Sequence, residues 1–168
     1  MIIEQITTQW EHIALWGLVA TVAMTAVLQG SQSMGLTRLS LPFLLGTAFT
    51  GVRSRASVAG FLAYMLGGWL FAGLYYAIMF NLGILAWWMG AVIGGVHALF
   101  LLVAVLPVLP YAHPRIANEY EGPGQMRRLE PPGFMGLNYG HRTPLTTLAG
   151  HLLYGAILGT TYGLVQAG

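Results

Sequence analysis

Two stripes of small residues, repeated at every fourth position, constrain this chain more than any other feature. The first lies in the stretch AWWMGAVIGGVHA and comprises Ala86, Gly90, Gly94 and Ala98. The second lies near the C-terminus and comprises His151, Gly155, Gly159 and Gly163. Residues spaced by four lie on one face of an α-helix. Such faces let two helix backbones touch, as helices do where lipid replaces water. The stripes therefore predict two membrane helices that pack directly against each other.

The composition places the chain in a membrane. Of its 168 residues, 56% are hydrophobic and only 7% are charged, whereas a soluble domain usually carries about a quarter charged residues. So few charges cannot cover a surface that faces water. Cysteine is absent, which excludes disulfides, thiolate metal sites and cysteine nucleophiles. A net charge of +2 gives no reason to expect a nucleic acid as partner.

Four apolar segments have the length of about 20 residues that a bilayer requires. We expect transmembrane helices over residues 13–35, 58–80, 84–106 and 144–166. The third should stop at Pro107 and Pro110, because proline interrupts a helix. A shorter apolar piece, 42–52, lies between arginines and predicts a re-entrant or interfacial segment. The expected fold is an all-α integral membrane protein, a single membrane domain over residues 1–168.

The arginines orient these four transmembrane helices. All seven fall in two connecting segments, 36–57 and 108–143. The positive-inside rule makes both loops cytoplasmic and both termini periplasmic if the membrane is a bacterial inner membrane. The N-terminus has neither the basic n-region nor the small-residue cleavage site of a signal peptide, so we expect the first span itself to direct insertion.

His97 and His151 are the candidate ligand-binding residues. His97 lies about midway along the third span, and an ionisable residue inside a membrane is a functional candidate by default. Counted from the loop that joins their helices, the two histidines lie at similar depth, as two axial ligands of a haem must. One interpretation is therefore a haem b or a quinone held by both. The other is a neutral His97 that hydrogen-bonds a neighbouring helix, for example at Thr21 or Tyr64, with no cofactor.

No other group of residues predicts catalysis, so we expect no enzyme. The loop 108–143 carries the ligand-type side chains His113, Glu119, Glu121 and His141, but no metal-binding spacing joins them, and a solvated or partner-facing loop is expected. No serine has a GxSxG context, and the chain has no aspartate to complete a triad. Four aromatic residues near the turn at Asn81 predict an outer aromatic belt, namely Tyr75, Tyr76, Trp87 and Trp88.

Two stretches, LPFLLGTAFTGVRSRA and GLNYGHRTPLTTLAGHLLYGAILGTTYG, resemble bacterial four-span inner-membrane proteins of the YagU-like group. The residues that carry this resemblance are Pro42, Gly46, Thr47, His151, Gly155 and Gly159. The resemblance implies a polytopic inner-membrane protein. It implies no activity, since the group has none firmly assigned.

These observations favour a small non-catalytic membrane protein. We expect an accessory or structural subunit of a larger membrane complex, or a homo-oligomer, whose partners are membrane lipids and other subunits or itself. The small extramembrane mass and the proline-rich loop 108–143 support this interpretation. Two alternatives remain: a haem- or quinone-binding protein that uses His97 and His151, and a small pore or lipid-handling protein.

Overall fold

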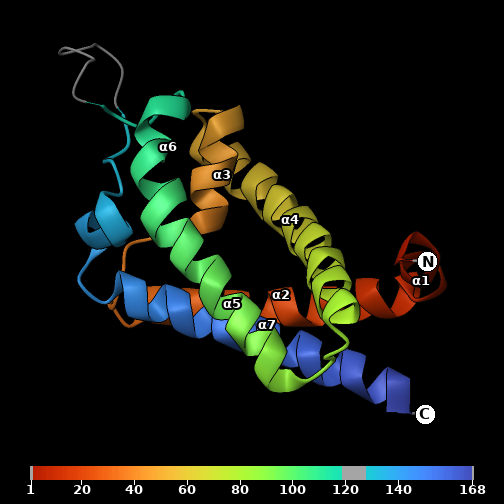
Figure 1. Ribbon diagram of the computed structural model, residues 1–168. Coiled ribbons are helices and arrows are strands. Elements are labelled where there is room, and N and C mark those ends of the chain that lie inside the picture. Colours follow the sequence, from red (N-terminus) through yellow and green to blue (C-terminus); the bar gives the residue numbers. More distant parts are fainter. Residues whose placement is uncertain (1, 119–127, 168) are drawn as a thin grey trace. The chain divides into compact units, whose positions relative to one another are not determined.

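The chain folds into α-helices, as expected. A computed structural model describes residues 2–118 and 128–167 (Figure 1). The helices in chain order are α1 (Ile2–Thr8), α2 (Trp10–Ser33), α3 (Leu41–Phe49), α4 (Arg53–Leu82), α5 (Trp87–Phe100), the π-helix η1 (Leu101–Val105), α6 (Leu106–Ala112), the 3₁₀-helix η2 (Phe134–Tyr139) and α7 (Thr143–Ala167). In this described part, an isolated bridge between Ile116 and Leu129 is the one β-type pairing.

Three helical segments are long and apolar enough to cross a membrane. They cover Trp10–Ser33, Arg53–Leu82 and Trp87–Ala112, and they overlap the first three predicted spans. The segment 42–52 overlaps the nine-residue helix α3, which has Ser40 as its N-cap residue and Pro42 in its first turn. Helix α7 has 25 residues but is not among these three, so the fourth span stays a prediction.

The predicted end of the third span was wrong. The helix passes Pro107 and Pro110 and ends at Ala112. Pro107 is the second residue of α6 and cannot donate a backbone hydrogen bond. The π-helix η1 directly before it changes the hydrogen-bond register, so the chain stays helical through the proline.

The chain divides into two compact units. Unit 1 comprises Met1–Leu28, Met65–Ala98 and Thr147–Gly168, and unit 2 comprises Gln29–Tyr64 and Leu99–Thr146. Because the boundaries fall inside helices, no linker marks them. The single membrane domain remains a prediction.

In unit 1, small residues bring helix backbones into contact. A Cβ atom on Gly90 or Gly94 of α5, or on Gly155 of α7, would overlap a backbone carbonyl of the opposite helix, and one on Gly159 of α7 would overlap the carbonyl of Ala86, directly before α5. The other members of the two stripes lie along the same line: Gly159 meets Ala86, Gly163 meets the carbonyl of Leu85, and Ala98 is fully buried. Helices α2 and α4 also pack closely, but here the glycines face side chains: Gly17 faces the Ala72 methyl group and Gly68 faces the Thr21 side chain.

In unit 2, α3 packs against the first half of α4 through another pair of glycines. Gly46 faces the carbonyl of Ala56, and Gly60 faces the carbonyl of Pro42, with no room for a Cβ at either position. The apolar core of this unit consists of Leu39, Leu44, Leu102, Leu106, Ile116 and Tyr139. The loop that follows Leu129 is tied to the chain before α3, since the Arg38 amide donates to the Tyr139 carbonyl at 2.7 Å.

Candidate functional site

The structure brings His97 and His151 together inside unit 1. Their ring centroids lie 4.9 Å apart and the planes are nearly perpendicular, at 83°. The contact follows from the α5–α7 packing, because Gly94, one turn before His97, touches the backbone carbonyl of His151. His151 is buried and His97 is half-buried. The glycine stripes thus position both imidazoles.

His97 is held by two residues of α4. The Tyr75 hydroxyl lies 3.1 Å from Nδ1 of His97, and the Phe71 ring lies 4.1 Å from the imidazole at a tilt of 32°. The expected hydrogen bond to a neighbouring helix is therefore present, but its partner is Tyr75; the hydroxyl of Thr21, one of the two partners given as examples, donates to the carbonyl of Gly17 in its own helix at 2.6 Å. Nε2 of His97 makes no hydrogen bond with any residue that the structure describes.

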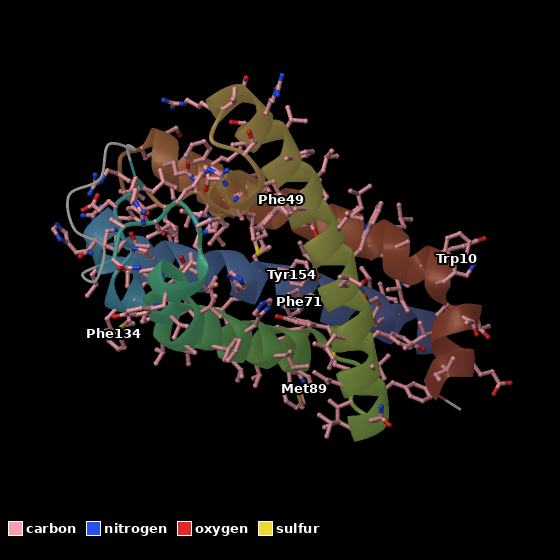
Figure 2. The ribbon with its side chains drawn as sticks, turned by 90° about the horizontal axis from the view of Figure 1, so that it is seen from above. Trp10, Phe49, Phe71, Met89, Phe134 and Tyr154 are labelled. Carbon is pink, nitrogen blue, oxygen red and sulfur yellow. The ribbon has the colours of Figure 1, made fainter. Side chains whose placement is uncertain are left out.

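His151 is held by its own helix. Its Nδ1 lies 2.8 Å from the Thr147 carbonyl, so Nδ1 carries the proton and donates it. Tyr154, one turn nearer the centre of α7, packs edge-on against Tyr75 with centroids 5.3 Å apart. Its hydroxyl donates to the Gly68 carbonyl of α4 at 2.6 Å. Figure 2 labels Phe71 and Tyr154 at this cluster of aromatic and imidazole rings.

The arrangement does not fit a haem bound through both histidines. Two axial imidazoles must lie on opposite sides of the macrocycle, with both coordinating nitrogens directed at the iron. Here the rings touch edge to face, and the α5 and α7 backbones meet at Gly94. The glycines therefore close the space that a porphyrin would occupy. Among the described residues, no group of three or more His, Asp or Glu side chains is placed to hold a metal ion.

The prediction of an outer aromatic belt was wrong for two of its four residues. Tyr75 and Tyr76 are 1% and 4% exposed, whereas Trp87 and Trp88 are 62% and 46% exposed. Tyr75 is instead a member of the site, together with Phe71 and Tyr154, which the sequence analysis did not select. The spacing of Phe71 and Tyr75, one turn apart on α4, is the signal that could have placed both on the face toward His97.

The prediction of a solvated loop was wrong for His113, which is 8% exposed within unit 2. Its Nδ1 accepts a hydrogen bond from the Arg115 amide at 3.1 Å, so Nε2 is the donor to the Leu44 carbonyl at 3.0 Å. His113 thus has a structural role, with both nitrogens paired. His141 is exposed, and Glu119 and Glu121 lie outside the described residues.

Comparison with known proteins gives no match to a family model, a curated protein or a solved structure. The resemblance to the YagU-like group is therefore still a prediction, and the function has to be argued from the residues themselves.

Proposed function

We propose that this chain is a small non-catalytic integral membrane protein with four spans that works as a subunit, either of a homo-oligomer or of a larger complex of the bacterial inner membrane. In this proposal α7 is the fourth span. Its 25 residues include no charged side chain. Three of its polar residues face the interior of unit 1, since His151, Tyr154 and Tyr162 are each 3% exposed or less. Their polarity thus follows from packing between helices and does not argue against a membrane position.

The charge distribution supports an orientation with both termini in the periplasm. Unit 1 contains Glu4 and Glu11 and no arginine, whereas all seven arginines belong to unit 2. In the cysteine-free chain, single cysteines report the side of the membrane cleanly. We expect a membrane-impermeant maleimide to label Asn81→Cys in intact cells. Ser54→Cys should react only after the inner membrane is opened, and the reverse pattern would refute the orientation.

The observation that carries the subunit proposal is that two glycines on α4 have open space beside them. A Cβ at Gly67 or Gly73 would have no atom within 4 Å. By contrast, the glycines of α5 and α7 described above face a neighbouring backbone. Glycine inside a helix costs about 1 kcal/mol relative to alanine. An uncovered glycine in a long apolar helix therefore favours a partner that approaches closely.

The surface around these glycines has the shape for helix docking. Gly67 and Gly73 lie three residues on either side of Leu70, which is 77% exposed. Leu66 and Leu74 beside it are 57% and 49% exposed. We call these five residues the α4 outer face. In a two-fold symmetric dimer, Leu70 of each copy would pack against the glycines of the other, because a two-fold interface uses the same patch twice.

Cysteine cross-linking in native membranes tests this proposal. We expect Gly67→Cys to form a disulfide-linked dimer under mild oxidation. Val96→Cys on α5, where the native side chain is 62% exposed, is the matched control and should stay monomeric. Native mass spectrometry of the gently extracted wild type should then show a defined oligomer or a stoichiometric partner. A monomer in lipid, with no cross-link at residue 67 and no partner, would refute the proposal.

A second candidate function, binding of a quinone or a similar lipid-soluble hydrogen-bonding ring, is supported by the surroundings of His97. Its Nδ1 is fixed by Tyr75 while its Nε2 has no partner among the described residues. The neighbouring Phe71 is 39% exposed and offers an aromatic face. A short-chain quinone should quench tryptophan fluorescence saturably, and His97→Phe should abolish saturation. Equal quenching of both proteins would refute this candidate. The small pore or lipid-handling alternative would require liposome flux that depends on the protein.

A further inference from the structure

The corner where α3 turns into α4 exposes apolar and basic side chains next to each other. Phe49 at the end of α3 is 69% exposed, and Val52 in the turn is 52% exposed. Arg53 and Arg55, in the first turn of α4, are also exposed. Leu45, one turn before Phe49, extends the apolar part and is 44% exposed. We call these five residues the basic corner.

The two arginines of the basic corner have no acidic partner among the described residues. Neither forms an ion pair with any residue that the structure describes. Glu130, the one acidic residue of unit 2 within the described ranges, lies 3.2 Å from Arg38 instead. The first turn of α4 has no acidic residue either. Two exposed positive charges at the start of one helix, without an acidic partner in the described part of the chain, favour the binding of an anion.

The basic corner is built on a fixed backbone. Helix α3 is packed onto α4 through Gly46 and Gly60. The guanidinium of Arg115 holds the C-terminal end of α3, since one of its nitrogens donates to the carbonyls of Thr47 and Ala48 at 2.7 and 3.1 Å. These contacts fix the chain just before the turn, so the backbone that carries Arg53 and Arg55 has a defined position.

We propose that the basic corner binds the phosphate headgroup of an anionic phospholipid. Arg53 and Arg55 contact the phosphate oxygens, for which the guanidinium group is well suited. Phe49 and Val52 contact the upper part of the acyl chains. The apolar neighbours distinguish this surface from a site for a free anion. The segment Arg53–Leu82 is apolar enough to cross a membrane and begins at the corner, which places the arginines at headgroup level. The inference rests on the proposed membrane position of α4 but not on self-association.

Native mass spectrometry with added lipid tests the proposal on the full-length protein. Dioleoylphosphatidylglycerol and dioleoylphosphatidylcholine are titrated separately into the protein in mild detergent. We expect the wild type to prefer the anionic lipid, and Arg53→Gln and Arg55→Gln each to lower that affinity about fivefold, the usual contribution of one basic residue near a charged bilayer. Arg38→Gln is the matched control with the same loss of charge. Because Arg38 is already paired with Glu130, its effect should be about twofold or less.

Two further measurements separate the alternatives. Phe49→Ser keeps both arginines, so it should weaken lipid binding, and excess inorganic phosphate should compete poorly with the lipid. Equal losses in Arg38→Gln and Arg55→Gln, or no preference for the anionic lipid, would overturn the proposal. Full competition by inorganic phosphate would also overturn it, since it would indicate a site for the free anion. The Gly67→Cys cross-link is measured on the same arginine variants, so failure of lipid binding is distinguishable from failure of self-association.

Discussion

Gly94 and Gly95 provide a direct test of the α5–α7 contact, because they are adjacent in sequence but differ in surroundings. A Cβ at Gly94 would overlap the backbone carbonyl of His151, which cannot move without shifting α7. A Cβ at Gly95 would lie 3.5 Å from the end of the Leu152 side chain, an ordinary contact. The substitutions Gly94→Ala and Gly95→Ala therefore add the same methyl group to two different environments.

The expected difference in stability follows from two contributions. Alanine is favoured over glycine in a helix by about 1 kcal/mol, and both variants gain this equally. Overpacking against a fixed neighbour costs about 1–3 kcal/mol, and only Gly94→Ala incurs it. Because the obstacle is backbone, we expect the upper part of that range. The two variants should then differ by about 2–3 kcal/mol, or roughly 30- to 150-fold in the unfolding equilibrium.

The measurement is unfolding of the purified variants in mild detergent by increasing fractions of dodecyl sulfate, followed by circular dichroism. We expect Gly95→Ala to be at least as stable as the wild type and Gly94→Ala to unfold at a lower fraction of the denaturing detergent. Stabilities equal within about 0.5 kcal/mol would show that α5 and α7 do not touch at Gly94, and the reasoning from glycine stripes would fail.

Three further predictions concern single side chains. Arg115→Gln should destabilise the protein by about 1.5–3 kcal/mol, because charged hydrogen bonds to the end of α3 are lost, and limited proteolysis near α3 should become faster. Burial raises the pKa of Tyr139 to about 12, so its stabilising contribution is complete below pH 10 and is lost as the pH rises through 12. Alkaline unfolding of Tyr139→Phe should lack this dependence. Tyr75→Phe should cost about 1 kcal/mol and change the imidazole NMR signals of His97, and unchanged signals would contradict the hydrogen bond.

The packing of α5 against α7 was the feature of the fold most directly predictable from the sequence, through the helical spacing of small residues. A four-residue repeat is a local property of the chain, and it specifies a face without reference to the rest of the molecule. The all-α fold was predicted correctly from the same patterns and the composition, and three of the helices are long and apolar enough to cross a membrane. The proximity of His97 and His151 followed from counting residues along two antiparallel helices.

The remaining features depend on contacts that residue spacing does not encode. Tyrosine suits both a lipid interface and a helix interior with a hydrogen-bond acceptor, so the burial of Tyr75 could not be inferred from its distance to a turn. His113 is buried against α3, where the Leu44 carbonyl, about 70 residues away in sequence, accepts a hydrogen bond from its Nε2. Proline usually ends a helix, and the π-helix that carries the chain past Pro107 has no recognisable sequence signal.

That π-helix affects the directions in which the side chains of the third long apolar helical segment, Trp87–Ala112, point. Its buried positions keep a strict period of four, namely Gly90, Gly94, Ala98, Leu102, Leu106 and Pro110. An α-helix turns about 100° per residue, so a four-residue repeat drifts by about 40° at each step. The wider turn of η1 rotates less per residue and offsets part of this drift. Deleting one residue from η1 would turn this wide turn into ordinary α-helix and change the direction of Leu106, which belongs to the apolar core of unit 2. The length of η1 therefore determines which side chains of α6 reach that core.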